Sequence, residues 1–248
     1  MDRFLYISMS GAKESMNALA VHGNNLANAN KTGFRASFQQ ARSMQAYGQG
    51  LPTRVFSMTE EPGQNFESGA LQMTGRDLDV AIQGDGWLVV ESEFGDQAMT
   101  RAGGLNINKE GFLIDGKGNQ LLDVQGSPIY IPLPVEKFSI RQDGMVEVRP
   151  EGAPAEAMEE IKQLKLVNPD IRGIERGEDG LFRRIDGVDP EFDQYVSLQS
   201  GSLESSNVNL SSELTSLINL QRQFEMQIKM MKNAEEIDKS SESLLRVV

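Results

Sequence analysis

The sequence predicts an α+β protein in which amphipathic helices at the two ends of the chain pair as a coiled-coil-like stem, with a central antiparallel β domain between them. Three observations lead to this fold class. An apolar seven-residue repeat runs through each end of the chain, a two-residue alternation replaces it in the middle, and glycine-containing turns interrupt that middle region. An isolated amphipathic helix is marginal in water, so the end segments must pack on each other, on other copies, or on both.

The first segment has the pattern of a helix packed along its length. Apolar residues recur at alternating steps of four and three residues, which keeps them on one helix face. A helix over residues 2–27 is about 39 Å long at about 1.5 Å per residue. An asparagine cluster and a glycine then end it, because Asn bonds to its own main chain and Gly supplies the backbone freedom of a helix exit. The candidate packing residues are Leu5, Met9, Ala12, Met16, Leu19 and Leu26, and the exit loop contains Asn24, Asn25, Asn28, Thr32, Gly33 and Phe34.

The last segment repeats the helical pattern over a greater length. Asn209 is a suitable N-cap, and a helix over residues 209–246 is roughly 57 Å long. One apolar line keeps a seven-residue step until Asp238 interrupts it, and a second line runs beside it. The candidate packing residues of this helix are Leu210, Leu214, Leu217, Phe224, Ile228 and Met231.

The middle of the chain changes to the two-residue period of β-strands. In residues 77–91, apolar and polar residues alternate, then Gly84-Asp85-Gly86 makes a turn before an apolar run. Residues 107–114 and 140–148 both predict hairpins around a glycine-containing turn. We therefore expect four regions: an N-terminal helix and loop (1–45), an extended connector (46–75), a β-rich domain (76–200) and a C-terminal helix (201–248).

The sequence offers little for catalysis or for binding a cofactor or metal. Residues 111–118 have the glycine and lysine spacing of a phosphate loop, but Gly118 stands where Ser or Thr should bind magnesium, and no helix is expected to follow. Residues 115–120 begin like a calcium loop and lack its later ligands and its required glycine. His22 is the only histidine and there is no cysteine, so a transition-metal site or a nucleophile–base pair is not expected.

Composition and charge exclude several further classes of protein. The net charge is −12 and is concentrated in the middle of the chain, which disfavours a nucleic-acid partner. The sequence has no run of apolar residues long enough for a membrane span, and its first 20 residues lack the apolar block of a cleaved signal peptide. We expect a soluble chain that, if exported, leaves the cytoplasm by another route.

Several collinear stretches resemble the flagellar basal-body rod and hook family. They are NNLANANKTGF at 24–34, DLDVAIQGDGWLVV at 77–90, TRAGGLNINKEGFLIDGKGNQLL at 100–122, GSLESSNVNL at 201–210 and INLQRQFEMQIKMMKNAEE at 218–236. MDRFLYISMSGAK at 1–13 resembles the proximal-rod members of the family, whereas RAGGLN departs mildly from the more usual Arg-Ala-Gly-Asn-Phe. The resemblance covers nearly the whole chain.

The resemblance implies a structural component of the bacterial flagellum rather than an enzyme. Such proteins pass through the flagellar export apparatus without a cleaved signal peptide and assemble in the periplasm with copies of themselves and with other rod proteins. Their terminal helices form the inner tube of a rod that transmits torque, and the β domain lies outside that tube. The candidate packing residues of the two end segments are then the assembly interface, and the exit loop is the signature loop of the family.

Two alternatives differ from a proximal-rod subunit. A distal-rod protein of the same family shares these motifs and is somewhat longer. A β-rich glycan-binding or hydrolytic domain carried on a coiled-coil oligomer fits the same helix and strand pattern. The latter would form a closed oligomer of finite size, whereas a rod subunit would polymerise through its termini.

Overall fold

A computed structural model of the chain describes residues 2–45, 55–59, 63–152, 154 and 157–245. The chain forms two compact units. Unit 1 combines the two ends of the chain with residues 35–65, and unit 2 combines residues 30–34 with residues 66–207. The observed fold class is α+β, with the two terminal helices packed together and a central antiparallel β region, as expected.

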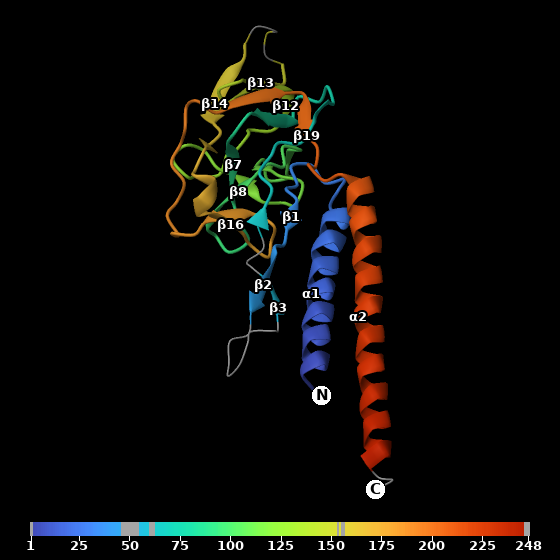
Figure 1. Cartoon of the computed structure of the whole chain (residues 1–248). Helices are drawn as coiled ribbons and strands as arrows, with labels where there is room; N and C mark the ends of the chain where they lie inside the picture. Colours follow the sequence, from blue (N-terminus) through green and yellow to red (C-terminus); the bar gives the residue numbers. More distant parts are fainter. Residues whose placement is uncertain (1, 46–54, 60–62, 153, 155–156, 246–248) are drawn as a thin grey trace. The chain divides into compact units, whose positions relative to one another are not determined.

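Unit 1 is built on two long antiparallel helices that lie side by side (Figure 1). They are α1 (Asp2–Ala27) and α2 (Leu210–Leu245), close to the expected 2–27 and 209–246. Asn209 caps α2 as expected, since its side-chain oxygen accepts bonds from the backbone N–H groups of Ser211 and Ser212 at 3.1 and 3.2 Å.

Four short strands complete unit 1. The strands β1 (Ser37–Phe38) and β4 (Gly63–Gln64) pair with each other, as do β2 (Ala41–Gln45) and β3 (Val55–Thr59). The β2–β3 pair packs beside α1 through β3. Two of these strands, β3 and β4, fall in the stretch 46–75 expected to be an extended connector, of which residues 46–54 and 60–62 lie outside the described residues.

Unit 2 contains a large antiparallel sheet and smaller ones. The large sheet has the order β16-β17-β8-β7-β11-β10-β9, with β15 also paired to β7. Its strands are β7 (Trp87–Glu91), β8 (Gln97–Thr100), β9 (Asn106–Ile107), β10 (Leu113–Ile114), β11 (Gln120–Leu121), β15 (Leu166–Val167), β16 (Ile174–Arg176) and β17 (Phe182–Arg184). The 3₁₀ turn η1 (Ile171–Gly173) precedes β16.

Some strand pairs of unit 2 join neighbours in the sequence, and others join segments that are far apart in it. Strands β12 (Val135–Ile140), β13 (Met145–Pro150) and β14 (Glu159–Gln163) form one sheet. The β9–β10 and β12–β13 pairs confirm the hairpins expected at 107–114 and 140–148. By contrast, β6 (Val80–Gln83) pairs with β18 (Ser197–Ser200) and not with β7, and β5 (Leu71–Met73) pairs with β19 (Ser202–Glu204).

The apolar core of unit 2 lies between these sheets. Its main cluster draws on most strands and includes Val80, Leu88, Val90, Leu105, Leu113, Ile129, Val146, Val148, Leu164, Leu166 and Leu198. A second cluster surrounds Trp87, which packs on Phe182 with ring centroids 4.6 Å apart. These clusters give unit 2 a core of its own.

Candidate assembly interface

The face of α1 that is least exposed is made largely of small and polar residues. Ser8, Ala12 and Ser15 are buried, and Leu19, His22 and Leu26 continue the same alternating steps of four and three. A Cβ added at Gly11 would lie 3.0 Å from the Gln227 Nε2 of α2. Small residues on this face therefore allow the two helices to approach closely.

The least exposed face of α2 also repeats every seven residues. Leu217, Phe224 and Met231 form one line and are half-buried. The second line is made by Leu220, Gln227 and Ala234, which are also half-buried. The pair of helices thus uses one continuous seam on each partner.

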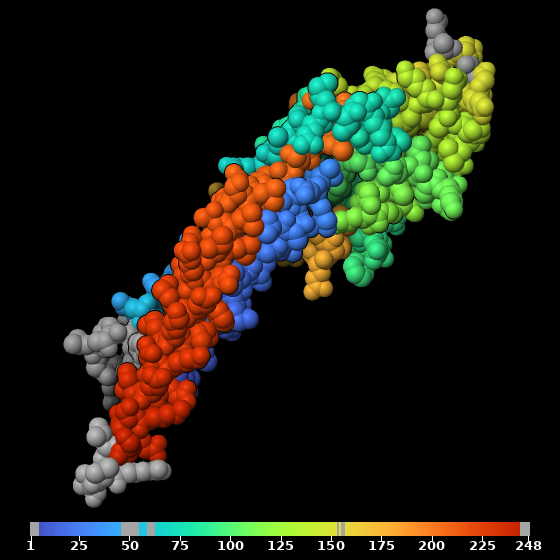
Figure 2. Space-filling model, turned by 90° about the vertical axis from the view of Figure 1, so that its right-hand side faces the viewer, coloured from blue at the N-terminus to red at the C-terminus, as the bar shows by residue number. Residues whose placement is uncertain are grey.

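A further set of apolar side chains on both helices stays exposed, and we call it the exposed apolar set. Figure 2 shows one side of α2 uncovered from its orange start to its red end. The exposed fractions reach 58% at Met16 of α1 and 63% at Ile237 of α2. The set comprises Leu5, Tyr6, Met9 and Met16 of α1, and Leu210, Leu214, Ile218, Met226, Met230 and Ile237 of α2.

The predicted packing residues therefore occupy two different environments. Ala12, Leu19, Leu26, Leu217, Phe224, Ile228 and Met231 are buried or half-buried, whereas Leu5, Met9, Met16, Leu210 and Leu214 belong to the exposed apolar set. Hydropathy alone assigned Met9 and Met16 to the line beside Ala12. In the structure Ser8 and Ser15 take that place, because a closely packed helix pair favours small side chains at the contact.

Asn25 lies in the last turn of α1 and is 1% exposed. Its Nδ2 donates to the Ser37 carbonyl at 2.7 Å, and its Oδ1 accepts from the Ser37 N–H at 2.9 Å. Only a side-chain amide supplies a donor and an acceptor in this way, so Asn25 bonds the backbone of β1 as a neighbouring strand would. The same Nδ2 lies 3.4 Å from Glu213 Oε1, and His22 Nδ1 bonds the other oxygen of Glu213. These contacts tie the end of α1 to the start of α2.

Asn28 and Asn24 finish α1 as expected of a helix exit. The Asn28 side chain donates to the Asn24 carbonyl at 2.8 Å, and its backbone N–H donates to the same carbonyl at 3.1 Å. Beyond this point the exit loop belongs to unit 2. Thr32 is half-buried there, and Gly33 and Phe34 are buried.

Gly33 and Phe34 fit unit 2 for separate physical reasons. Gly33 has a φ of +67°, and a Cβ there would lie 2.3 Å from the Arg101 carbonyl carbon, so only glycine fits. Its N–H donates to the Glu204 carbonyl at 2.8 Å. The Phe34 ring lies under the Arg176 guanidinium, 4.6 Å from the ring centroid.

A buried ion pair, which sequence reasoning missed, joins the two segments that contact Gly33 in space. Arg101 Nη1 donates to Glu204 Oε2 at 3.0 Å, and these side chains are 3% and 1% exposed. Glu204 Oε1 also accepts from the Gly69 N–H at 2.8 Å, and Arg101 Nη2 donates to the Gly84 carbonyl at 2.8 Å. Arg101 additionally lies 5.4 Å over the Trp87 ring. The pair therefore connects four segments of unit 2, around Gly69, Gly84–Trp87, Arg101 and Glu204.

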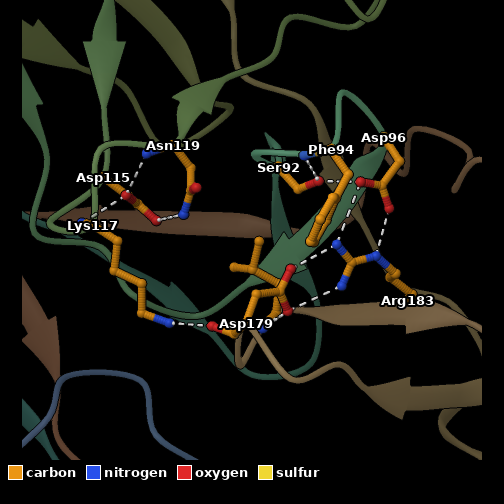
Figure 3. Close-up of polar contacts among 9 residues, drawn as sticks. Ser92, Phe94, Asp96, Asp115, Lys117, Asn119, Asp179 and Arg183 are labelled. Atoms are coloured by element: carbon orange, nitrogen blue, oxygen red, sulfur yellow. Dashed lines mark hydrogen bonds and ion pairs between the residues drawn. The ribbon is translucent and has the colours of Figure 1, made fainter.

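A second polar cluster forms around Arg183 at the surface of unit 2 (Figure 3). Its guanidinium donates to Asp179 at 2.7 and 3.0 Å and to Asp96 at 2.5 Å. Those hydrogen bonds lower the pKa of Asp96 to about 2, lower the pKa of Asp179, and raise the pKa of Arg183. The cluster holds two charged carboxylates in place and contains no group poised for acid–base catalysis near neutral pH.

The loop with phosphate-like spacing lies next to this cluster and forms a tight turn. Asp115 accepts bonds from the backbone N–H groups of Lys117 and Asn119 at 2.8 and 2.9 Å. Lys117 is exposed and donates to the Asp179 carbonyl at 2.9 Å (Figure 3). The strand β11 follows the loop, where a phosphate loop requires a helix.

Within the described ranges, no three or more His, Cys, Asp or Glu side chains gather in a way that could hold a metal ion. Neither of the two long helices, over the residues described, combines the length and apolarity needed to cross a membrane.

The helix pair, the exit loop and the β unit all have counterparts in known proteins. Residues 5–35 match the family model described as "Flagella basal body rod protein". Residues 81–148 match "Flagellar hook protein FlgE/F/G D1 domain", and residues 199–244 match "Flagellar basal body rod FlgEFG protein C-terminal". The three matched segments cover α1 with the exit loop, part of the β strands of unit 2, and the last strands of unit 2 together with α2.

Individual relatives match over nearly the whole chain. The "Flagellar basal-body rod protein FlgF" of Escherichia coli (strain K12) is 34% identical over 242 residues, which cover 95% of each chain. The protein of the same name from Salmonella typhimurium (strain LT2) is 34% identical over 99% of each chain. The "Flagellar basal-body rod protein FlgG" of Bacillus subtilis (strain 168) is 33% identical over 96% of this chain and 97% of its own. The chain therefore belongs to the flagellar basal-body rod protein family, and it is FlgF-like within that family.

Proposed function

We propose that this chain is a non-enzymatic structural subunit of the proximal flagellar rod. It reaches the periplasm through the flagellar export apparatus without a cleaved signal peptide. There it polymerises through unit 1 with copies of itself and with adjacent rod proteins, and the finished rod transmits torque. Membership of the rod family and the near full-length similarity to FlgF proteins support this function.

The single observation that carries the proposal is the exposed apolar set on both terminal helices. Pairing of α1 with α2 leaves ten large apolar side chains of the described helices at least 38% exposed. Apolar surface on this scale, running along both helices, is typical of a surface that is covered in an assembly. Moving such a side chain from full exposure to full burial contributes about 1.5–3 kcal/mol, and each of these side chains, 38–63% exposed in the chain alone, can gain the remaining part of that on assembly.

The two environments of the predicted packing residues suggest a division of roles. The half-buried seam that contains Leu19, Phe224 and Met231 holds α1 against α2 within one chain, as a coiled-coil-like stem. The exposed apolar set then packs against neighbouring subunits. The exit loop ends α1 and connects the stem to Gly33 and Phe34 of unit 2.

Replacing Met16 with Asp tests this division. Met16 is 58% exposed, so we expect the free energy of unfolding of the purified chain to change by less than about 0.5 kcal/mol. In cells that carry only the variant, we expect swimming to be lost, because the new carboxylate would be buried unpaired against a neighbour. The measurements are denaturant unfolding and the diameter of swim rings in soft agar.

Asn17→Asp is the matched control, since it adds the same charge at the next exposed position of α1. Cells with this variant should swim. Wild-type swimming of Met16→Asp cells would show that this face of α1 does not contact neighbours.

A further inference from the structure

A groove in unit 1 lies among the first half of α1, the β2–β3 pair and α2. It has a volume of about 430 Å³. Ile7 and Gly11 of α1, Arg42 of β2, Val55 and Phe56 of β3, and Met230 of α2 are among its lining residues. Val55 is 43% exposed and Met230 is 40% exposed, so an apolar rim remains open beside a basic side chain.

The floor of this groove contains a buried polar group that lacks a hydrogen-bond partner within the described residues. Ser8 lines the groove and is 1% exposed. Its Oγ has no hydrogen-bond partner among the described residues. A buried hydroxyl without a hydrogen-bond partner is less stable than one whose hydrogen bonds are satisfied. An occupant that brings a small polar side chain to the floor would supply such a partner.

α2 extends beyond the start of α1, and this extension has no partner helix among the described residues of unit 1. The two helices have 36 and 26 residues. Because His22 faces Glu213 and Gly11 faces Gln227, the antiparallel register brings the first residue of α1 opposite the turn around Glu235. Residues Ile237–Leu245 therefore pass the end of α1, as Figure 1 shows, and we call them the α2 overhang.

The α2 overhang complements the groove in size, polarity and charge. Ile237 is 63% exposed and provides an apolar side chain for the apolar rim. Ser240, Ser241 and Ser243 are small hydroxyl residues on the same nine-residue segment, which allow a close approach of the helix to the floor around Ser8. The overhang carries two acidic residues, Asp238 and Glu242, and one basic residue, Lys239, so it is acidic by one charge, whereas the groove is lined by the basic Arg42.

We propose that the α2 overhang of one copy of this chain docks into the groove of a second copy. The proposal rests on the proposed function, in which unit 1 is the assembly unit. The groove is continuous with the α1–α2 contact, since Gly11 and Gln227 line it and also meet across the helix pair. The two surfaces are different parts of one chain, so the contact is heterologous. It leaves a free groove at one end of the assembly and a free overhang at the other. Such contacts build open helical polymers.

Cysteine cross-linking in assembled basal bodies tests the contact, because the chain has no cysteine of its own. Cells produce two differently tagged copies, one with Val55→Cys at the groove rim and one with Ser240→Cys on the overhang. We expect a mild oxidant to form a disulfide-linked species that carries both tags, since a disulfide requires Cβ atoms about 3.5–4.5 Å apart. A second pair, Ser57→Cys with Ser243→Cys, tests the same contact at a neighbouring position of the groove and of the overhang.

The matched control replaces Ser240→Cys with Gln221→Cys, an exposed position of α2 outside the overhang. It should give at least tenfold less cross-linked species. If both tagged copies are present in basal bodies of swimming cells and neither cysteine pair cross-links, the docking proposal is wrong and the proposed function stands. Cross-linking of the overhang only to a different rod protein also overturns it. Absence of tagged wild-type chain from basal bodies would overturn the proposed function itself.

Discussion

Glu204→Ala should lower the free energy of unfolding of unit 2 by about 3–5 kcal/mol, the usual effect of removing one member of a buried ion pair. Glu204 and Arg101 are 1% and 3% exposed, so the Arg101 guanidinium would lose its carboxylate partner away from water. The Gly69 N–H would lose its acceptor as well. Because the Glu204 carboxylate binds both Gly69, near the start of the 66–207 stretch, and Arg101, in its middle, the loss should affect the whole unit.

Fluorescence of Trp87, the only tryptophan of the chain, reports this change during urea unfolding. The ring is buried in unit 2 and lies 5.4 Å from the Arg101 guanidinium carbon. Glu160→Ala is the matched control, because Glu160 also pairs with an arginine, Arg141, but its side chain is 58% exposed. It should cost less than about 1 kcal/mol. Equal losses in the two variants would mean that the buried pair does not hold unit 2 together.

Phe224→Asp should disrupt the helix pair without changing the stability of unit 2. Phe224 is half-buried on the seam of α2, within unit 1. The substitution removes a large apolar side chain and places a carboxylate in the contact with α1, which together cost about 3–5 kcal/mol. We expect the helical signal in circular dichroism to fall and swimming to be lost, whereas the Trp87 unfolding midpoint stays unchanged.

Lys229→Gln is the control for Phe224→Asp, because Lys229 is exposed on the same helix. It should retain the helical signal and swim like the wild type. A fall in the Trp87 midpoint of Phe224→Asp would contradict the independence of the two units. Normal swimming of that variant would contradict a role of the helix pair in assembly.

Local sequence patterns predicted much of this fold. The seven-residue repeat and the capping residue Asn209 located both helices within one residue of their observed ends. Glycine turns located the β9–β10 and β12–β13 hairpins, since such pairs depend on neighbouring residues. The asparagines of the exit loop predicted where α1 ends.

Contacts between distant parts of the chain were not predicted. The pairing of β6 with β18 joins strands more than 100 residues apart, and the Arg101–Glu204 pair spans 103 residues. A single sequence carries no periodic signal for either. The helix contact shows the same limit, because hydropathy favours Met9 and Met16 whereas close helix approach favours Ser8 and Ser15.

The most direct test of the central claim is an image of the assembled rod at side-chain resolution, in which the exposure of Met16, Ile218 and Met226 is measured. In the chain alone these side chains are 52–58% exposed. We predict that neighbouring rod subunits bury all three, while Phe224 stays packed against α1 of its own chain. If the three side chains remain exposed and the contacts between subunits come from unit 2 alone, the terminal helices are not the assembly core.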